Sequence, residues 1–182
     1  MTYAAALSNG FTAASILDDS PVSFPSAGGA YSPVNYDGKF HGKLPLRIAL
    51  ANSLNIPAVK TLQAVGISTM VHLARDMGIS SWDPNDDYGL SVTLGSKEVT
   101  MLDMVTVNGT FANQGMRVDL NPILKISNFK GEVLEEKNSP SGRQILQPGV
   151  AYIMADILAD NNSRSMEFGP NSPLNIPGHT VS

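Results

Sequence analysis

The sequence contains no cysteine, and this absence excludes several kinds of site. Disulfide bonds, zinc sites built on thiolates and cysteine nucleophiles all require that residue. The sequence also lacks any apolar run near the roughly 20 residues that a membrane-spanning helix needs. No signal peptide follows Met1. A membrane anchor would therefore have to lie outside this sequence.

Charge is scarce as well. Charged residues make up 15% of the 182 residues, the net charge is −4 and no basic cluster is present, which argues against a general nucleic-acid-binding protein. Apolar residues make up 42%, which argues against a disordered chain. A chain of this length suits one domain with a real hydrophobic core.

Residues that could hold a metal ion are few and badly spaced. No histidine has a second histidine or a carboxylate at metal-ligand spacing, and neither Asp18-Asp19 nor Asp86-Asp87 has the pattern of a calcium loop. We therefore expect no metal or cofactor, solvated loops at the aspartate pairs, and surface or loop-tethering roles for the histidines. The histidines are His41, His72 and His179.

Apolar periodicity and turn signals predict an α+β chain that is mainly helical. Ser68 is expected to cap one helix, and Thr100 with Asp103 to form a capping box. Apolar segments on both sides of residues 128–131 predict one β-hairpin. The predicted helices cover residues 3–8, 44–52, 57–65, 68–77, 100–113 and 148–158, and long ordered loops cover 20–42 and 80–95.

Two sets of apolar residues are expected to hold these elements in place. Aromatic side chains of the first loop are expected to pin it to the surface, and apolar side chains of the last helix are expected to enter the core. The aromatic set is Phe24, Tyr31, Tyr36 and Phe40, and the core set is Tyr152, Ile153, Ile157 and Leu158.

A proline interrupts the helical pattern of residues 44–65. Pro57 has no N–H to donate to the carbonyl of Ser53, and its ring clashes with that carbonyl. A proline also pushes the preceding residue toward extended geometry. The sequence therefore predicts two helices, with Ser53, Leu54 and Asn55 at the break between them.

Ser53 and Asn55 are the first candidates for chemistry. On a broken helix they can point a hydroxyl, which relays a proton, and a carboxamide, which donates and accepts hydrogen bonds, into one cleft. The pattern alone is weak, because Ser and Asn at a helix break are more often caps. On the residues themselves both interpretations stay open.

Several stretches, in order along nearly the whole sequence, match one family of proteins. One is Asn-Tyr-Asp-Gly-Lys-Phe-His-Gly at residues 35–42, and another runs through residues 46–60 and includes Ser53 and Asn55. Shorter matches lie at residues 3–7, 18–22, 88–95, 98–100 and 168–174. Together these stretches resemble the transpeptidase domain of class A (bifunctional) penicillin-binding proteins, and their co-linearity is more specific than any single motif.

The resemblance implies three catalytic motifs, of which we expect this chain to carry one. Ser53 and Asn55 match the Ser-x-Asn motif, which in the family lies between two helices of an all-helical lobe. The Ser-x-x-Lys motif, with the nucleophile and its lysine partner, would lie just before residue 1. The Lys-Thr-Gly motif of the inner edge strand would follow residue 182. We therefore expect an interior piece of the domain in which Ser-x-x-Lys and Lys-Thr-Gly are absent.

The activity that the resemblance implies is D,D-transpeptidation of peptidoglycan stem peptides. A serine attacks the D-Ala-D-Ala end of one stem, D-alanine leaves, and an amine of a neighbouring stem takes the acyl group. β-Lactams mimic the donor and leave a stable acyl-enzyme. Ser53 would help pass a proton to the leaving amine, and Asn55 would bind the donor amide and help orient the lysine. Because the nucleophile and the oxyanion donors would lie outside this chain, we expect the chain alone to be inactive.

The same resemblance implies a partial penicillin-binding-protein and serine β-lactamase-like fold with an incomplete antiparallel sheet. One truncated domain, residues 1–182, would hold a helical lobe at 44–115, a β-hairpin at 120–137 and a helix at 148–161 that packs on the sheet. With most strands absent, that helix would expose apolar surface, and we expect self-association. The parent protein would be anchored in the inner membrane, with this domain on the extracytoplasmic side.

The sequence leaves two other interpretations to compare with the enzyme. A serine β-lactamase relative is disfavoured, because such enzymes usually have a shorter Ser-x-Asn neighbourhood without the stretch at residues 35–42. A non-catalytic cell-envelope binding or scaffold module that has lost the outer motifs is the alternative from a different functional class. The genomic sequence on both sides separates it from the enzyme.

Overall fold

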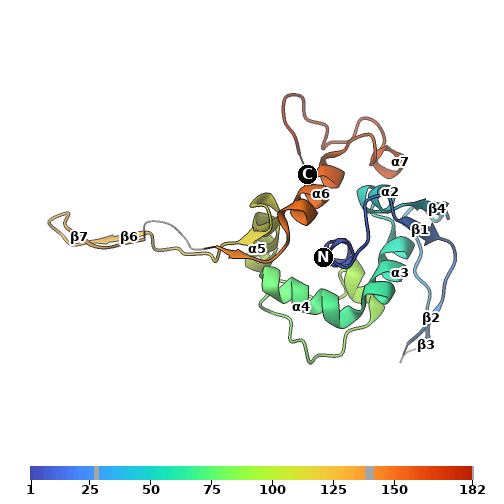
Figure 1. Ribbon diagram of the computed structural model, residues 1–182, viewed down its shortest axis with the longest axis horizontal. Coiled ribbons are helices and arrows are strands. Elements are labelled where there is room, and N and C mark those ends of the chain that lie inside the picture. Colours follow the sequence, from blue (N-terminus) through green and yellow to red (C-terminus); the bar gives the residue numbers. More distant parts are fainter. Residues whose placement is uncertain (27–28, 138–141, 182) are drawn as a thin grey trace.

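The computed structural model describes residues 1–26, 29–137 and 142–181, and it is mainly helical with short antiparallel strands (Figure 1). The helices are α1 (Thr2–Ser8), α2 (Leu46–Ala51), α3 (Asn55–Val65), α4 (Ile67–Met77), the 3-10 helix η1 (Leu90–Leu94), α5 (Met101–Ala112), α6 (Pro148–Ala159) and α7 (Ser165–Phe168). The strand pairs are β1 (Ile16–Asp19) with β4 (Gly42–Pro45), β2 (Phe24–Ser26) with β3 (Gly29–Tyr31), β5 (Met116–Arg117) with β8 (Arg143–Gln144), and β6 (Lys125–Ser127) with β7 (Val133–Glu136). The predicted α+β class is confirmed.

Helix α1 occupies the middle of the molecule. Its residues from Thr2 to Leu7 are buried, and Ala4 and Ala6 are fully enclosed. Small side chains let neighbouring helices come close, and α3, α4 and α6 contact α1 from different sides (Figure 1). The hydrophobic core therefore forms around α1, and the other helices turn their apolar faces toward it.

Helix α2 ends and α3 begins within three residues. The N–H of Ser53 donates to the carbonyl of Leu50 at 3.0 Å, and the N–H of Leu54 donates to the carbonyl of Ala49 at 3.0 Å. This pair of bonds is a Schellman motif, and Ser53 takes its left-handed position with φ of 53°. The predicted break is confirmed at Ser53 and Leu54, whereas Asn55 already belongs to α3.

The second helix begins two residues earlier than predicted. Helix α3 starts at Asn55, and Pro57 is the third residue of its first turn. Proline is tolerated there because the N–H groups of the first turn have no intrahelical carbonyl to reach. The proline therefore defines the start of α3 without being its first residue.

The predicted loop at residues 20–42 contains structure that periodicity did not show. Strands β2 and β3 form a second hairpin within it, and Gly42 begins β4. Phe24 is buried, but Tyr36 is 94% exposed and Phe40 is 51% exposed, so the aromatic anchoring is wrong for those two residues. Hydrogen bonds to buried polar side chains hold this segment instead, as described below.

Of the other helix predictions, some are confirmed and some are wrong. The capping box of Thr100 and Asp103 is confirmed. The cap by Ser68 is wrong, because α4 begins at Ile67, directly after Gly66, and no side chain caps it. In α6, Ile157 is buried as predicted and Ile153 is partly buried. Tyr152 and Leu158 are exposed, because the buried positions of α6 (Val150, Ala151, Met154 and Ile157) recur every three or four residues along one face.

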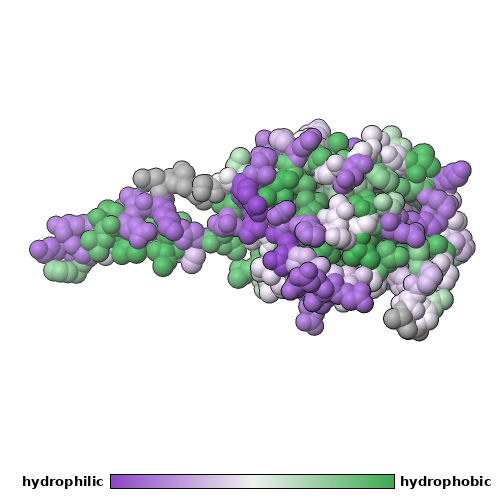
Figure 2. All heavy atoms as spheres, turned by 60° about the horizontal axis from the view of Figure 1, so that its bottom comes forward, coloured by the Kyte–Doolittle hydropathy of each residue, from purple (hydrophilic) through white to green (hydrophobic). Residues whose placement is uncertain are grey.

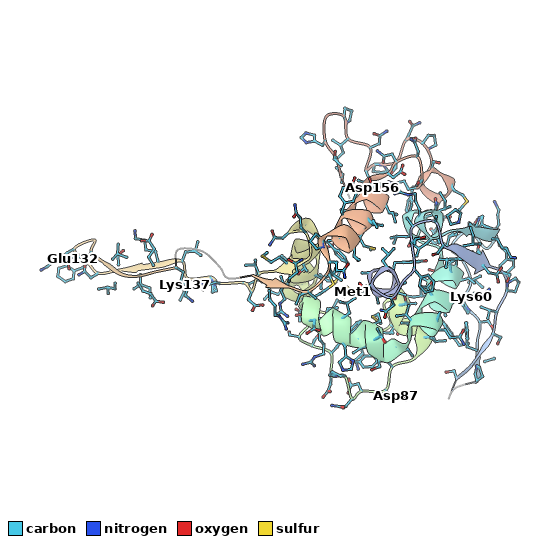
Figure 3. All side chains as sticks on the ribbon, viewed as in Figure 1. Met1, Lys60, Asp87, Glu132, Lys137 and Asp156 are labelled. Atoms are coloured by element: carbon cyan, nitrogen blue, oxygen red, sulfur yellow. The ribbon has the colours of Figure 1, made fainter. Side chains whose placement is uncertain are left out.

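Strands β6 and β7 form an arm that projects from the helical body (Figure 1). The predicted hairpin is confirmed, but every residue of its two strands is exposed. Hydrophobic and hydrophilic residues are mixed along the arm (Figure 2), and Glu132 lies near its outer end (Figure 3). At the end of the chain Val181 belongs to no strand, and Ser182 lies outside the described residues.

Candidate active site

Ser53 and Asn55 lie on the wall of a cavity of about 430 Å³. The break between α2 and α3 brings them there, because the left-handed turn at Ser53 redirects the chain before α3 starts. The cavity is also lined by residues from α1, η1 and the segments before and after η1. Its polar lining includes Thr2, Tyr3, Thr93 and Lys97.

A second cavity, of about 390 Å³, lies against the same two residues. Ser53 and Asn55 line both cavities, so the turn between α2 and α3 forms the wall that the two share. The remaining lining of the second cavity consists of Tyr36, Asn52, Glu167 and Phe168. Residues from three distant parts of the sequence therefore meet at Ser53 and Asn55.

The hydroxyl of Ser53 is exposed and has no hydrogen-bond partner among the described residues. Its left-handed backbone carries a steric cost of about 1–2 kcal/mol for a residue with a Cβ. A serine nucleophile needs an adjacent base, and none of the described groups takes the Ser53 proton.

Lys97 is the lysine that lines the larger cavity, and its charge is already engaged. Its Nζ donates to Asp86 Oδ2 at 2.9 Å and lies 5.2 Å from the centre of the Tyr88 ring. The hydrogen bond to Asp86 raises the pKa of Lys97. A lysine that accepts a proton needs a lowered pKa, so Lys97 is not suited to act as a base.

The backbone and the side chain of Asn55 are both held by residues 34 and 35. Asn55 N–H donates to Asn35 Oδ1 at 3.0 Å, and Asn55 Nδ2 donates to the carbonyl of Val34 at 2.7 Å. Neither Ser53 nor Asn55 caps α3 with its side chain, because the N-cap residue is Leu54 and no side chain of the break bonds to the first turn. The interpretation of these residues as side-chain caps of α3 is therefore wrong, but the backbone of Ser53 does belong to the Schellman cap that ends α2.

Asn35 in turn belongs to a buried polar cluster. Its Nδ2 donates to the two carboxylate oxygens of Asp19 at 2.9 and 2.8 Å and to the carbonyl of Lys39 at 2.8 Å. Asp19 also accepts the backbone N–H of His41 at 2.9 Å and lies 2.8 Å from its Nδ1. The prediction of a solvated loop is wrong for Asp19, which is fully buried, whereas the loop-tethering role of His41 is confirmed.

Asn52, like Asn35, is a buried side chain that binds a distant segment, and it does so beside the second cavity. It is 1% exposed, its Nδ2 donates to the carbonyl of Ser163 at 2.7 Å, and its Oδ1 accepts the N–H of Glu167 at 2.9 Å. These bonds fix the segment that carries Glu167 and Phe168 next to Ser53. Sequence patterns missed these roles of Asn35 and Asn52, because the segments that the two side chains hold, at Asn55, Ser163 and Glu167, lie far from them along the chain.

The expectation that the chain has no Ser-x-x-Lys spacing is wrong. Ser127 and Lys130 have this spacing, and they lie at β6 and the turn that follows it. That hairpin forms the arm outside the helical body, and neither residue lines the two cavities (Figure 1). The spacing at residues 127–130 therefore supplies no nucleophile to Ser53 and Asn55.

The class of protein follows from this fold together with comparison against known families. The model of the penicillin binding protein transpeptidase domain matches residues 1–171, so the chain belongs to this family. The matched residues include the helical core, the turn with Ser53 and Asn55, and both cavities.

Relatives of known identity are penicillin-binding proteins 1A of bacteria. The chain is 33% identical over 168 residues to the protein of Neisseria meningitidis and 36% identical over 158 residues to that of Aquifex aeolicus. These matches cover 87% and 86% of this chain but only 20% and 21% of the relatives. The chain thus spans about one fifth of the length of the relatives it matches.

Solved structures agree on the fold. Penicillin-binding protein 1A from Haemophilus influenzae superposes with a TM-score of 0.78 at 23% identity, covering 87% of this chain and 28% of that one. The penicillin G acyl-enzyme complex of penicillin-binding protein A from Mycobacterium tuberculosis gives 0.79 at 22% identity, covering 98% and 43%. Within the part that the structure describes, no helix is both long and apolar enough to cross a bilayer.

Proposed function

We propose that this chain is part of a D,D-transpeptidase that crosslinks peptidoglycan stem peptides by serine acyl transfer and is acylated by β-lactams. Membership of the transpeptidase family supports this function. The observation that carries it is the placement of Ser53 and Asn55, the Ser-x-Asn pair, on the wall shared by two cavities. That wall is where a donor and an acceptor could approach one site from two sides.

Ser53 and Asn55 have different tasks in this proposal. Ser53, with an unengaged hydroxyl, relays a proton to the leaving amine during acylation. Asn55 binds the donor amide through its carboxamide, whose Oδ1 has no hydrogen-bond partner among the described residues. The nucleophile, its lysine and the oxyanion donors come from sequence outside this chain. Met1 and Thr2, at the start of α1, line the same cavity as Ser53.

The partners and location follow from the same proposal. The full-length protein would bind peptidoglycan stem peptides and β-lactams, and it would work on the extracytoplasmic side of the inner membrane. Its bacterial relatives are penicillin-binding proteins 1A, which supports a place in the cell envelope. The anchor would belong to the rest of the protein.

The test compares the 182-residue chain with the full-length gene product after incubation with penicillin. Intact mass spectrometry is expected to show a stoichiometric adduct on the full-length protein, on a serine other than Ser53, and none on the chain. In the full-length protein, Ser53→Ala should slow acylation by about 10²–10⁴-fold, the usual contribution of a proton relay. Ser68→Ala, on the exposed face of α4, is the matched control and should acylate normally.

Each outcome has a clear meaning. An adduct on the isolated chain would show that it carries its own nucleophile and would contradict the division of labour proposed above. A full-length protein that forms no adduct would favour a non-catalytic binding or scaffold module of the same fold.

A further inference from the structure

Helix α3 starts with backbone donors that its own sequence does not satisfy. The first N–H groups of a helix have no intrahelical partner, and Leu54 at the N-cap position offers no side-chain acceptor. Pro57 has no N–H, so the donors left over in this turn are those of Asn55 and Ile56. Ala58 N–H is the first to reach back, to the carbonyl of Leu54 at 3.4 Å.

One atom from elsewhere in the chain takes both donors. Asn35 Oδ1 accepts the N–H of Asn55 at 3.0 Å and that of Ile56 at 3.3 Å. Asn35 is 3% exposed, and it lies 20 residues before Asn55. The start of α3 is therefore capped by a buried side chain from the loop before β4.

Asp19 determines the orientation of the Asn35 carboxamide. A carboxylate only accepts hydrogen bonds, so the NH₂ of Asn35 must face Asp19, and its oxygen is left to face α3. The Lys39 carbonyl at 2.8 Å also accepts from this NH₂ and favours the same orientation. A reversed amide would set its NH₂ against two N–H donors and its oxygen against three acceptor oxygens.

We propose that Asp19 and Asn35 are positioning residues for the Ser-x-Asn pair. Asp19 orients the Asn35 carboxamide, Asn35 fixes the first turn of α3, and that turn fixes Asn55. The neighbouring Val34 carbonyl holds Asn55 Nδ2 at 2.7 Å, so the same loop sets both the backbone and the side chain of Asn55. The catalytic consequence of this inference rests on the proposed function, because misplacing a binding group by about 1 Å can cost on the order of 10²-fold in rate.

The first experiment needs no activity and uses the 182-residue chain. Amide hydrogen exchange is followed by NMR at Asn55 and Ile56 in the wild type, in Asn35→Ala and in the control Asn113→Ala at the end of α5. In Asn35→Ala both amides are expected to exchange faster by on the order of tenfold, the effect of losing a hydrogen bond. The amide of Leu62, one turn before the end of α3, should change far less. Unchanged exchange at Asn55 and Ile56, or equal acceleration throughout α3, would overturn the proposal.

The second experiment measures acylation of the full-length gene product by a fluorescent penicillin and separates binding from the acylation rate constant. Asn35→Asp sets a second carboxylate against Asp19 and should lower the rate constant by about 10²-fold. Adding Asp19→Asn restores a donor opposite an acceptor, so the double variant should recover part of the loss. A merely structural role would lower the amount of folded protein without such recovery in the rate constant.

The two experiments separate two kinds of failure. A double variant as slow as Asn35→Asp, or a single variant that acylates at the wild-type rate, would refute the positioning role. A wild-type protein that is not acylated at all would refute the proposed function, while hydrogen exchange at Asn55 and Ile56 would still decide whether Asn35 holds the start of α3.

Discussion

Helices α3 and α5 begin in opposite ways. Helix α5 is capped by its own residues, because Thr100 Oγ1 accepts the N–H of Asp103 at 3.1 Å and Asp103 reaches back to the N–H of Thr100. Helix α3 is capped by Asn35, from a different element. A local cap lets a helix start form independently of its surroundings. A remote cap ties the start of α3 to the loop that also holds the Asn55 side chain, which suits a site that needs one fixed geometry.

Two residues other than glycine have a left-handed backbone among those described. One follows the end of α2, just before α3, and the other follows the end of α5. Ser53 and Gln114 each have φ of 53°, and each follows a helix whose end is closed by a bond between residues five apart. Leu54 N–H reaches Ala49, and Gly115 N–H reaches Thr110. Glycine is the usual residue at this position, so both side chains are kept at a steric cost. Only Ser53 lies at the Ser-x-Asn turn, where retained strain often accompanies function.

Replacing each of these residues by glycine gives the largest expected difference. In the full-length protein, Ser53→Gly should slow acylation by about 10²–10⁴-fold because the relaying hydroxyl is gone. In the 182-residue chain the same change should leave stability equal or higher by up to about 1 kcal/mol, since the left-handed strain is relieved. Fluorescent-penicillin labelling and thermal unfolding measure the two effects.

Gln114→Gly is the matched control for that prediction. It should give a similar gain in unfolding temperature with no change in acylation. If Ser53→Gly destabilised the chain while Gln114→Gly stabilised it, the strain at Ser53 would be absent and the comparison of the two turns would fail.

Removing the local cap of α5 should have an intermediate effect, on stability. Asp103 is buried and also accepts hydrogen bonds from the side chains of Ser80 and Ser81, so Asp103→Ala should cost about 1–3 kcal/mol in the free energy of unfolding. Urea denaturation of the chain measures this loss. The amides of Asn55 and Ile56 should keep their hydrogen-exchange protection relative to global unfolding, and faster local exchange there would show that the two helix starts are coupled.

Lowering the pH should also reveal how much the Asp103 carboxylate stabilises the chain, without a mutation. Burial raises the pKa of Asp103, but hydrogen bonds from Ser80, Ser81 and Thr100 outweigh it and lower the pKa to about 2. An unfolded aspartate has a pKa of about 3.9, so the stabilisation is complete above that pH and is lost as the pH falls toward 2. The wild type should therefore lose more stability than Asp103→Asn between about pH 4 and pH 2, and parallel curves would contradict this assignment.

The smallest expected effect is on self-association of the chain, through the solvent-facing side of one of the two helices. Helix α3 is mostly buried, whereas α5 exposes Met101 by 81%, Leu102 by 65% and Val105 by 54%. We expect weak self-association of the chain through this apolar face of α5, detectable by light scattering at high concentration. The double variant Leu102→Lys, Val105→Lys should scatter as a monomer, and a wild type that stays monomeric throughout the concentration series would rule the interaction out.

Local rules were sufficient for a large part of this molecule. Pro57 predicted the break between two helices, Thr100 with Asp103 predicted a capping box, and apolar segments predicted the hairpin of β6 and β7. Each of these features depends on residues within a few positions of one another. The family resemblance was also visible in the sequence, and the family match confirms it.

The site was only partly predictable for the same reason. Ser53 and Asn55 could be singled out by their position at the break, but their surroundings could not. Asp19, predicted to be solvated, is fully buried, because Asn35 and His41 supply donors that compensate for the loss of water. Tyr36 and Phe40 were predicted to anchor their loop and are exposed, since that buried polar cluster holds it instead.

The sequence by itself determined where α2 must stop and which residues stand at the turn, because a proline and a helix end act over a few residues of backbone. The tertiary structure alone decided what the turn can do. It brought Asn35 to the start of α3 and Asn52 to the segment with Glu167, and it placed Ser53 and Asn55 between two cavities. Hydrogen bonds between residues far apart in the sequence exist only once burial around α1 has brought those residues together.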